Sequence, residues 1–192
     1  VINRLSSNRA DLVGLCRFVN NERVPMDYLK AQEISRVKEL SKNKHVLVIQ
    51  DTTDFNYNDH INFLSTEDED LGPAGNDEVI GFFLHTGLVV DTANGLGLGF
   101  SYINVWNRQW DKAGKQNRKY KQQPIESKES YRWIDCGLKS KSILSSVKSI
   151  TIVADREGDI YDEFVSVPDQ RTNILIRACQ NRCLAEGDTL YE

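Results

Sequence analysis

Two acidic residues, far apart in the chain, each follow a short apolar stretch. Asp51 comes directly after 46–50 (VLVIQ), and Asp155 comes directly after 149–154 (SITIVA). Runs of this kind, rich in β-branched residues, predict strands buried on both faces. A carboxylate at the end of such a strand needs solvent, a cation or a metal. If both strands end at the same edge of one sheet, the two acids can hold a divalent cation between them.

Each acid also has a structural explanation that involves no metal. Asp51 suits an Asx-type turn at a strand end, and Asp155 suits the N-cap of a helix that follows it. The two acids favour metal binding over these explanations only if their strands are neighbours. The order of the other elements decides that point.

The period of the apolar residues predicts those elements. Helices are expected over 9–20, 127–144 and 160–165. A further helix is expected after Pro25, with Leu29, Val37 and Leu40 in its buried stripe. Strands are expected over 45–51, 79–90, 95–105, 149–155 and 173–177, with a tight turn at 92–95 and a long acidic loop at 55–78.

The predicted order is therefore β-β-β-α-β-α-β behind an N-terminal helical segment. This is an α/β fold class with a mixed sheet, and the order matches that of ribonuclease-H-like proteins. In that arrangement the first and fourth strands are adjacent and parallel, and a right-handed crossover brings Asp51 and Asp155 side by side. We expect 1–44 to be a helical segment and 45–180 to form this mixed sheet with its helices.

Composition narrows the class of protein. A chain of 192 residues fits one domain with at most a small appendage, and a net charge of −4 gives no overall basic field. The apolar runs are of strand length, which predicts no membrane partner. Four cysteines and three histidines are scattered, which argues against zinc and favours free thiols in a reducing cytoplasm. Because the chain begins at Val1 and ends at Glu192, we expect a fragment of a longer protein.

A basic segment is the candidate nucleic-acid contact. It carries six cations and one acid, Asp111, with three aromatic residues interleaved, a mixture that suits phosphate contact and base stacking better than a solvated loop. The six cations are Arg108, Lys112, Lys115, Arg118, Lys119 and Lys121. His85 lies mid-strand among apolar residues, which favours a core histidine over a ligand and leaves any further role open.

Several short motifs together resemble a known family. In chain order they are Gln50–Thr53 (QDTT), Leu71–Gly75 (LGPAG), His85, Lys128–Ser130 with Trp133, Asp155–Ile160 (DREGDI) and Leu175–Arg177 (LIR). The set resembles the DDE transposases of the insertion-sequence-four, or Tn-five-like, group over about residues 17 to 191. The pair of DTT and DREGDI at this separation is its most specific part.

The resemblance implies an insertion-sequence transposase that carries out DNA recombination by cut-and-paste transposition. Asp51 and Asp155 would be two of three acidic ligands for Mg²⁺, with Mn²⁺ as a substitute, and Arg156 and Arg177 would contact DNA. The third ligand, a Glu, lies in this family on a later helix, beyond a β-rich insertion. By the resemblance, 45–180 would be the first part of the catalytic core and 181–192 would begin that insertion, so neither Glu186 nor Glu192 is in the right place. The fragment would then bind metal weakly and be nearly inactive.

The family also implies a mechanism and partners. Asp51 would bridge two metal ions and Asp155 would hold one, while water and then the freed 3′-hydroxyl attack phosphorus. Partners would be transposon-end duplex DNA, target DNA and a second copy in the synaptic complex, in a bacterial cytoplasm beside the nucleoid. Two alternatives stay open: a non-catalytic DNA-binding or inhibitory module derived from a transposase, and another ribonuclease-H-like nuclease.

Overall fold

The structure is a computed structural model that describes residues 2–59, 69–75, 79–110, 122–183 and 187–190. Its helices are α1 (Ile2–Leu5), α2 (Arg9–Val19), α3 (Met26–Ser41), α4 (Tyr131–Ile143) and α5 (Tyr161–Ser166), with short 3₁₀ turns at Ile125–Ser127 and Arg156–Gly158. Its strands are β1 (His45–Asn56), β2 (Gly72–Ala74), β3 (Val79–Asp91), β4 (Gly97–Trp106), β5 (Ser149–Ala154) and β6 (Thr172–Ile176).

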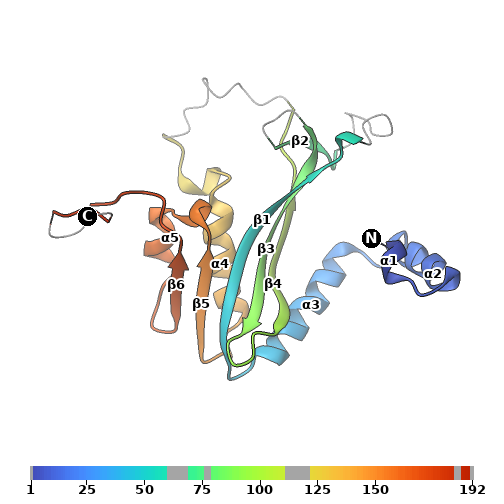
Figure 1. Cartoon of the computed structure of the whole chain (residues 1–192), viewed down its shortest axis with the longest axis horizontal. Coiled ribbons are helices and arrows are strands. Elements are labelled where there is room, and N and C mark those ends of the chain that lie inside the picture. Colours follow the sequence, from blue (N-terminus) through green and yellow to red (C-terminus); the bar gives the residue numbers. More distant parts are fainter. Residues whose placement is uncertain (1, 60–68, 76–78, 111–121, 184–186, 191–192) are drawn as a thin grey trace.

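All of these strands belong to one mixed sheet. The strand order is β2-β3-β1-β5-β6, with β4 paired to β3 (Figure 1). β1 runs antiparallel to β3 and parallel to β5, and β5 runs parallel to β6. The predicted α/β class with a mixed sheet is therefore confirmed. The first strand and the one after α4 are adjacent and parallel, as the order of elements predicted.

β1 is longer than the sequence predicted. It continues to Asn56, so that Asp51 lies inside the strand and not at its end. The reason is that its two neighbours differ in length: the parallel ladder with β5 stops at Ile49–Val153, whereas the antiparallel ladder with β3 continues to Asn56–Gly81. Asp51 therefore lies just past the point where β1 loses its neighbour on the β5 side.

The sheet has one covered face. Val37 of α3 and Ile134 of α4 join Val48 of β1 and Ile152 of β5 in one buried cluster. The alternate residues of the strands point to the opposite face, where Ile49 is 37% exposed. The prediction that these strands are buried on both faces is wrong for the described residues, because both helices pack on the same side.

One helix lies outside the core, and two local predictions differ from the structure. No residue of α2 is buried, and Figure 1 shows α1 and α2 standing apart from the sheet. In α3, Val37 is fully buried as predicted, but Leu40 is 42% exposed because it lies off the stripe that meets β4. The Gly72–Ala74 segment, predicted as loop, is a short edge strand, a position where Pro73 needs no donor to a neighbour.

The predicted turn between β3 and β4 is confirmed. The Gly95 amide donates to the Asp91 carbonyl (2.8 Å), and Gly95 has φ +72°, a value that favours glycine. Among the described residues no helix has both the length and the apolar character needed to cross a membrane.

Candidate metal and nucleic-acid site at the ends of β1, β5 and β6

Three predicted site residues occupy corresponding positions on three neighbouring parallel strands. Ile49 pairs with Val153, and Val153 pairs with Leu175. Two residues further along the chain come Asp51, which is still within β1, and Asp155 and Arg177, which directly follow β5 and β6. Because side chains alternate along extended chain, all three lie on the open face of the sheet, together with Ile49 and Leu175.

Asp51 is available for binding. It is exposed and opposite Thr86 on β3, and its carboxylate has no hydrogen bond or ion pair to any described residue. The Asx turn considered above is absent at this position, since the residue continues a regular strand. The carboxylate therefore has both oxygens free for a cation.

Asp155 combines the two roles that its sequence context suggested. It is the N-cap of the 3₁₀ turn Arg156–Gly158, and its Oδ1 accepts the backbone N–H of Glu157 (2.8 Å). Its other oxygen has no partner within the described ranges, and the residue is exposed. The cap fixes the orientation of the carboxylate and leaves one oxygen for a ligand.

The donor set suits a hard cation but is incomplete by itself. Two carboxylates from adjacent strands are the ligand type that Mg²⁺ and Mn²⁺ prefer. No group of three or more His, Cys, Asp or Glu residues lies close enough, in the part of the chain that the structure describes, to enclose a metal ion. All four cysteines are free thiols, in keeping with the sequence reading.

The predicted DNA-contacting cations fall into three groups. Arg156 and Arg177 are exposed, and neither guanidinium has a partner among the described side chains. Arg108, by contrast, forms a two-pronged ion pair with Glu129 (2.7 and 2.8 Å), donates to the Gly75 carbonyl and lies 4.5 Å from the centre of the Phe83 ring. The other predicted cations, Lys112, Lys115, Arg118, Lys119 and Lys121, lie outside the described residues.

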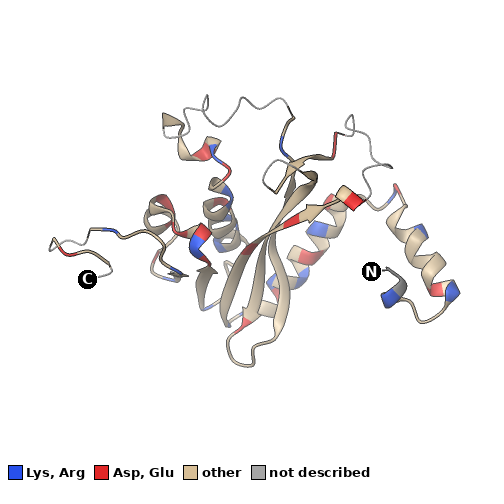
Figure 2. Cartoon of the chain, turned by 45° about the horizontal axis from the view of Figure 1, so that its top comes forward, with Lys and Arg blue, Asp and Glu red and all other residues tan. Residues whose placement is uncertain are grey.

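Charge is distributed unevenly over the ribbon. Figure 2 shows Lys and Arg interspersed with Asp and Glu along the helices and connecting segments, while the strands carry few charges of either sign. The net charge of −4 therefore does not describe the local situation at the strand ends. There, two unpaired arginines stand beside two exposed aspartates.

A buried polar network runs beneath Asp51, and the sequence reading predicted only one of its members. His85 is fully buried, with Nδ1 2.8 Å from the Thr52 hydroxyl and Nε2 3.2 Å from Gln50 Oε1. Burial and the charge of Arg132 lower the pKa of His85 to about 3, so the ring is neutral at physiological pH. The interpretation of His85 as a satisfied core histidine is confirmed.

The network ends at Glu163 of α5. Gln50 Nε2 donates to Glu163 Oε1 (3.3 Å), while the buried Oε2 has no partner within the described part of the chain. Burial raises the pKa of Glu163 to about 7, although the Gln50 hydrogen bond acts in the opposite direction. A Gln inside an apolar strand was the available sequence signal, because a buried amide must find partners.

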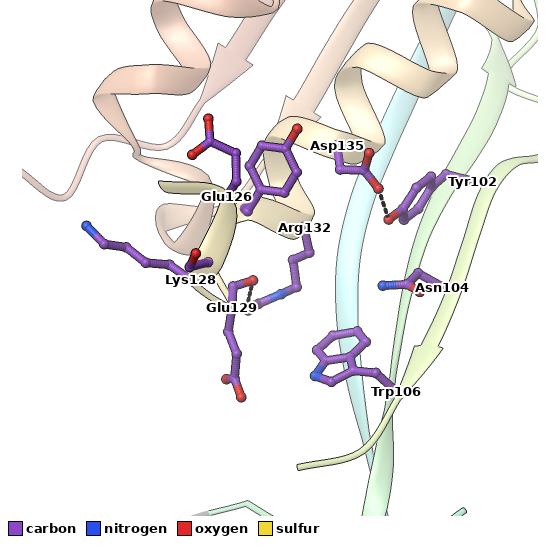
Figure 3. A pocket seen from close by; sticks show the side chains of 10 residues that line it. Tyr102, Asn104, Trp106, Glu126, Lys128, Glu129, Arg132 and Asp135 are labelled. Carbon is purple, nitrogen blue, oxygen red and sulfur yellow. Dashed lines mark hydrogen bonds between the residues drawn. The ribbon is translucent and has the colours of Figure 1, made fainter. Parts of the chain in front are cut away.

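A cleft of about 290 Å³ lies between β4 and the start of α4 (Figure 3). Two of its carboxylates are already engaged: Asp135 accepts hydrogen bonds from Tyr102 (2.6 Å) and Lys139 (2.8 Å), and Glu129 pairs with Arg108. Burial raises the pKa of the Tyr102 hydroxyl far above its ordinary value, so it is not a nucleophile at neutral pH. The cleft is therefore a weaker candidate for chemistry than the strand ends.

Comparison of the chain with protein-family models and with curated proteins gives no match. The transposase resemblance therefore stays a prediction.

Proposed function

We propose that this chain is part of the catalytic core of a DDE transposase with a ribonuclease-H-like fold. The observation that carries the proposal is the parallel β1–β5 ladder, whose last pair, Ile49–Val153, precedes Asp51 and Asp155 by two residues on each strand. The run of antiparallel strands followed by a helix and parallel strands agrees with the arrangement expected for that fold. The activity would be metal-dependent cleavage of DNA and transfer of the freed strand.

The residues present fit a divalent cation as two of its ligands. Asp51 offers a free carboxylate, and Asp155 offers one oxygen while its cap fixes the other. Bound Mg²⁺ or Mn²⁺ ions supply activation of an attacking oxygen and stabilisation of the leaving oxygen at phosphorus. A third carboxylate, a Glu on a later helix, is what the family resemblance implies.

The remaining side chains at the strand ends would orient the nucleic acid. Arg156 and Arg177 stand beside Asp155 with no competing partner among the residues described, so each is available to a phosphate. Arg108 is committed to Glu129 and is better explained as a support for the start of α4. Transposon-end DNA, target DNA and a second copy of the chain are the partners proposed.

Manganese titration tests the metal site. Adding Mn²⁺ to the ¹⁵N-labelled chain should broaden the amide signals around Asp51 and Asp155 before all others, since paramagnetic broadening falls steeply with distance. Asp51→Asn and Asp155→Asn should each abolish the selective effect. Asp54→Asn, which alters an exposed acid on the same strand, is the matched control and should leave it intact. Broadening that persists in Asp51→Asn contradicts the metal site.

A second candidate is a non-catalytic DNA-binding or inhibitory module. The observation that favours it is the absence of a three-residue ligand group among the described residues. Gel-shift experiments on duplex DNA with and without Mg²⁺, followed by a plasmid-nicking assay, separate the two. Binding with no nicking, even after a helix bearing a third acid is supplied in a longer protein, supports the inhibitory module.

A further inference from the structure

One arginine joins the two segments that carry the acids. Arg132 Nε donates to the Thr52 hydroxyl (2.9 Å) on β1, and one terminal nitrogen donates to Glu157 (3.0 Å) in the turn after β5. The other terminal nitrogen donates to the backbone carbonyl of Glu129 (3.0 Å) at the start of α4. The side chain is only 16% exposed. A single guanidinium thus connects three elements.

Two of these contacts are next to the predicted ligands. Thr52 directly follows Asp51, and the Glu157 amide is the donor to the Asp155 cap. We infer that Arg132 is a positioning residue, which fixes the spacing between the Asp51 and Asp155 carboxylates. The inference rests on the metal site proposed above and adds a residue that no motif had assigned to it.

Arg132 is itself held in place by aromatic rings. Its guanidinium carbon lies 5.6 Å from the ring centres of both Trp106 and Trp133. Trp106 in turn stacks on Phe83, with ring centres 5.4 Å apart and planes 20° apart. A planar guanidinium can stack on rings and donate to three acceptors at once, whereas a lysine ammonium cannot meet both demands.

The contact with Thr52 has a defined direction. The Gln50 oxygen Oε1 faces His85 Nε2, so Nδ1 is left to accept the Thr52 hydroxyl proton (2.8 Å), while the hydroxyl oxygen accepts from Arg132 Nε. His85 then carries its own proton on Nε2 and donates to Gln50, whose amide donates to Glu163. Thr52 is therefore fixed from two sides, and with it the backbone that presents Asp51.

Amide hydrogen exchange tests this role without any metal. Arg132→Lys keeps the charge but loses the three-way contact, so exchange at Glu157 and Gly158 should accelerate on the order of tenfold. The matched control is Arg171→Lys, because Arg171 also donates to three acceptors, the carbonyls of residues 144, 145 and 147, at the opposite end of the sheet. The control should leave exchange at Glu157 and Gly158 unchanged.

Manganese affinity provides the second measurement. Arg132→Lys should weaken Mn²⁺ binding by about tenfold, the usual effect of losing a residue that orients a ligand. Glu157→Ala removes only the hydrogen bond between Arg132 and the exposed Glu157 carboxylate, and it should also weaken Mn²⁺ binding. Thr52→Val should also weaken binding, and Thr52→Ser, which keeps the hydroxyl, should restore it.

The outcomes separate the two proposals. If the unaltered chain binds Mn²⁺ no better than Asp51→Asn, the metal site is wrong, and the exchange data alone decide the role of Arg132. If Asp51→Asn abolishes binding but Arg132→Lys behaves like Arg171→Lys in both measurements, the positioning role is overturned and the metal site stands.

Discussion

Arg177 follows β6 at the position that Asp155 takes after β5. Ala154 and Ile176 form the last pair of the parallel ladder, and the Arg177 amide donates to the Ala154 carbonyl (3.2 Å). The backbone of both residues is thereby fixed, while both side chains reach solvent. The guanidinium of Arg177 is thus held next to Asp155, a predicted metal ligand. This placement suits a phosphate that contacts both the arginine and a metal ion bound by Asp155.

This placement predicts how duplex DNA should bind. Replacing Arg156 and Arg177 together by Gln should weaken binding and lower the slope of log Kd against log salt by about 2, roughly one for each lost phosphate contact. Fluorescence anisotropy at several salt concentrations measures both quantities. The control is Lys148→Gln, since Lys148 is also exposed but precedes β5 at the opposite end of the strand. Equal losses in the control and the double variant would contradict a local contact.

The sequence correctly predicted that β1 and β5 are adjacent and parallel, but it overestimated how much of each strand is buried. Val48 and Ile152 are buried as the apolar runs require, but Ile49 is 37% exposed. An unbroken run of large apolar residues has no signal that tells a strand covered on one side from one covered on both. That difference depends on where the helices pack, which is a tertiary property.

Arg108 illustrates a second limit. In the sequence Arg108 is the first cation of the basic segment, and the excess of positive charge in that segment predicted that it contacts DNA. In the structure its side chain is 22% exposed and pairs with Glu129, which lies just before α4. The sequence separation between the two hides the pair, so a count of charges overestimates how many are available.

The buried network could have been anticipated only in part. Gln50 and His85 each interrupt an apolar run, which signals that a polar partner must be near. Their shared link to Glu163 was not visible, because α5 reads as a short amphipathic helix with an acid on it. Only the packing of α5 beside α4 brings that carboxyl to Gln50.

The Glu163 carboxyl should make stability depend on pH. Its pKa is raised from 4.5 to about 7, so the folded state holds a proton that the unfolded state releases. Its contribution to the free energy of unfolding is full below pH 4.5 and is lost as pH rises through 7. Glu163→Gln should therefore be more stable than the unaltered chain at pH 8, by about 1–3 kcal/mol, and nearly equal to it at pH 4.5.

Urea unfolding at a series of pH values measures this difference. His85 acts in the opposite sense, because its pKa is lowered to about 3 and stability falls as pH drops below 6.5. That term is common to both proteins and cancels in the comparison. Asp162→Asn, an exposed acid on the same helix, should show no such pH-dependent gain. A constant offset between Glu163→Gln and the unaltered chain would show that ionisation is not its cause.

Gly158 packs where no side chain fits. A methyl group at this position would come within 2.6 Å of the Ala154 side chain and 3.2 Å of the Trp133 ring. Gly158→Ala should therefore destabilise the chain by about 1–3 kcal/mol, the usual cost of overpacking. Gly14→Ala is the contrast, since nothing lies within 4 Å of the added group and helix propensity alone predicts a gain of up to about 1 kcal/mol. Thermal or urea unfolding compares the two, and a stable Gly158→Ala would contradict the packing argument.

Asp159 holds the segment that leaves β6. Its side chain is fully buried and accepts the backbone N–H groups of Cys179 (2.7 Å) and Gln180 (2.8 Å), and it pairs with Arg182. Burial alone would raise the pKa of this carboxyl, but those hydrogen bonds and the arginine outweigh it and hold the pKa below its ordinary value. The stability that Asp159 supplies is therefore present above pH 3.8 and lost as pH falls through the lowered pKa.

Asp159→Asn should release this segment. Loss of the charge weakens every one of these bonds, so we expect a loss of about 1.5–3 kcal/mol in stability and faster amide exchange at Cys179 and Gln180. Asp188→Asn removes an exposed acid from the same part of the chain and should change neither. Because Asp159 also follows the turn capped by Asp155, its loss should disturb exchange at Glu157 as well. If exchange accelerates only at Cys179 and Gln180, the two ends of the turn are held independently, and Asp159 supports the departing segment alone.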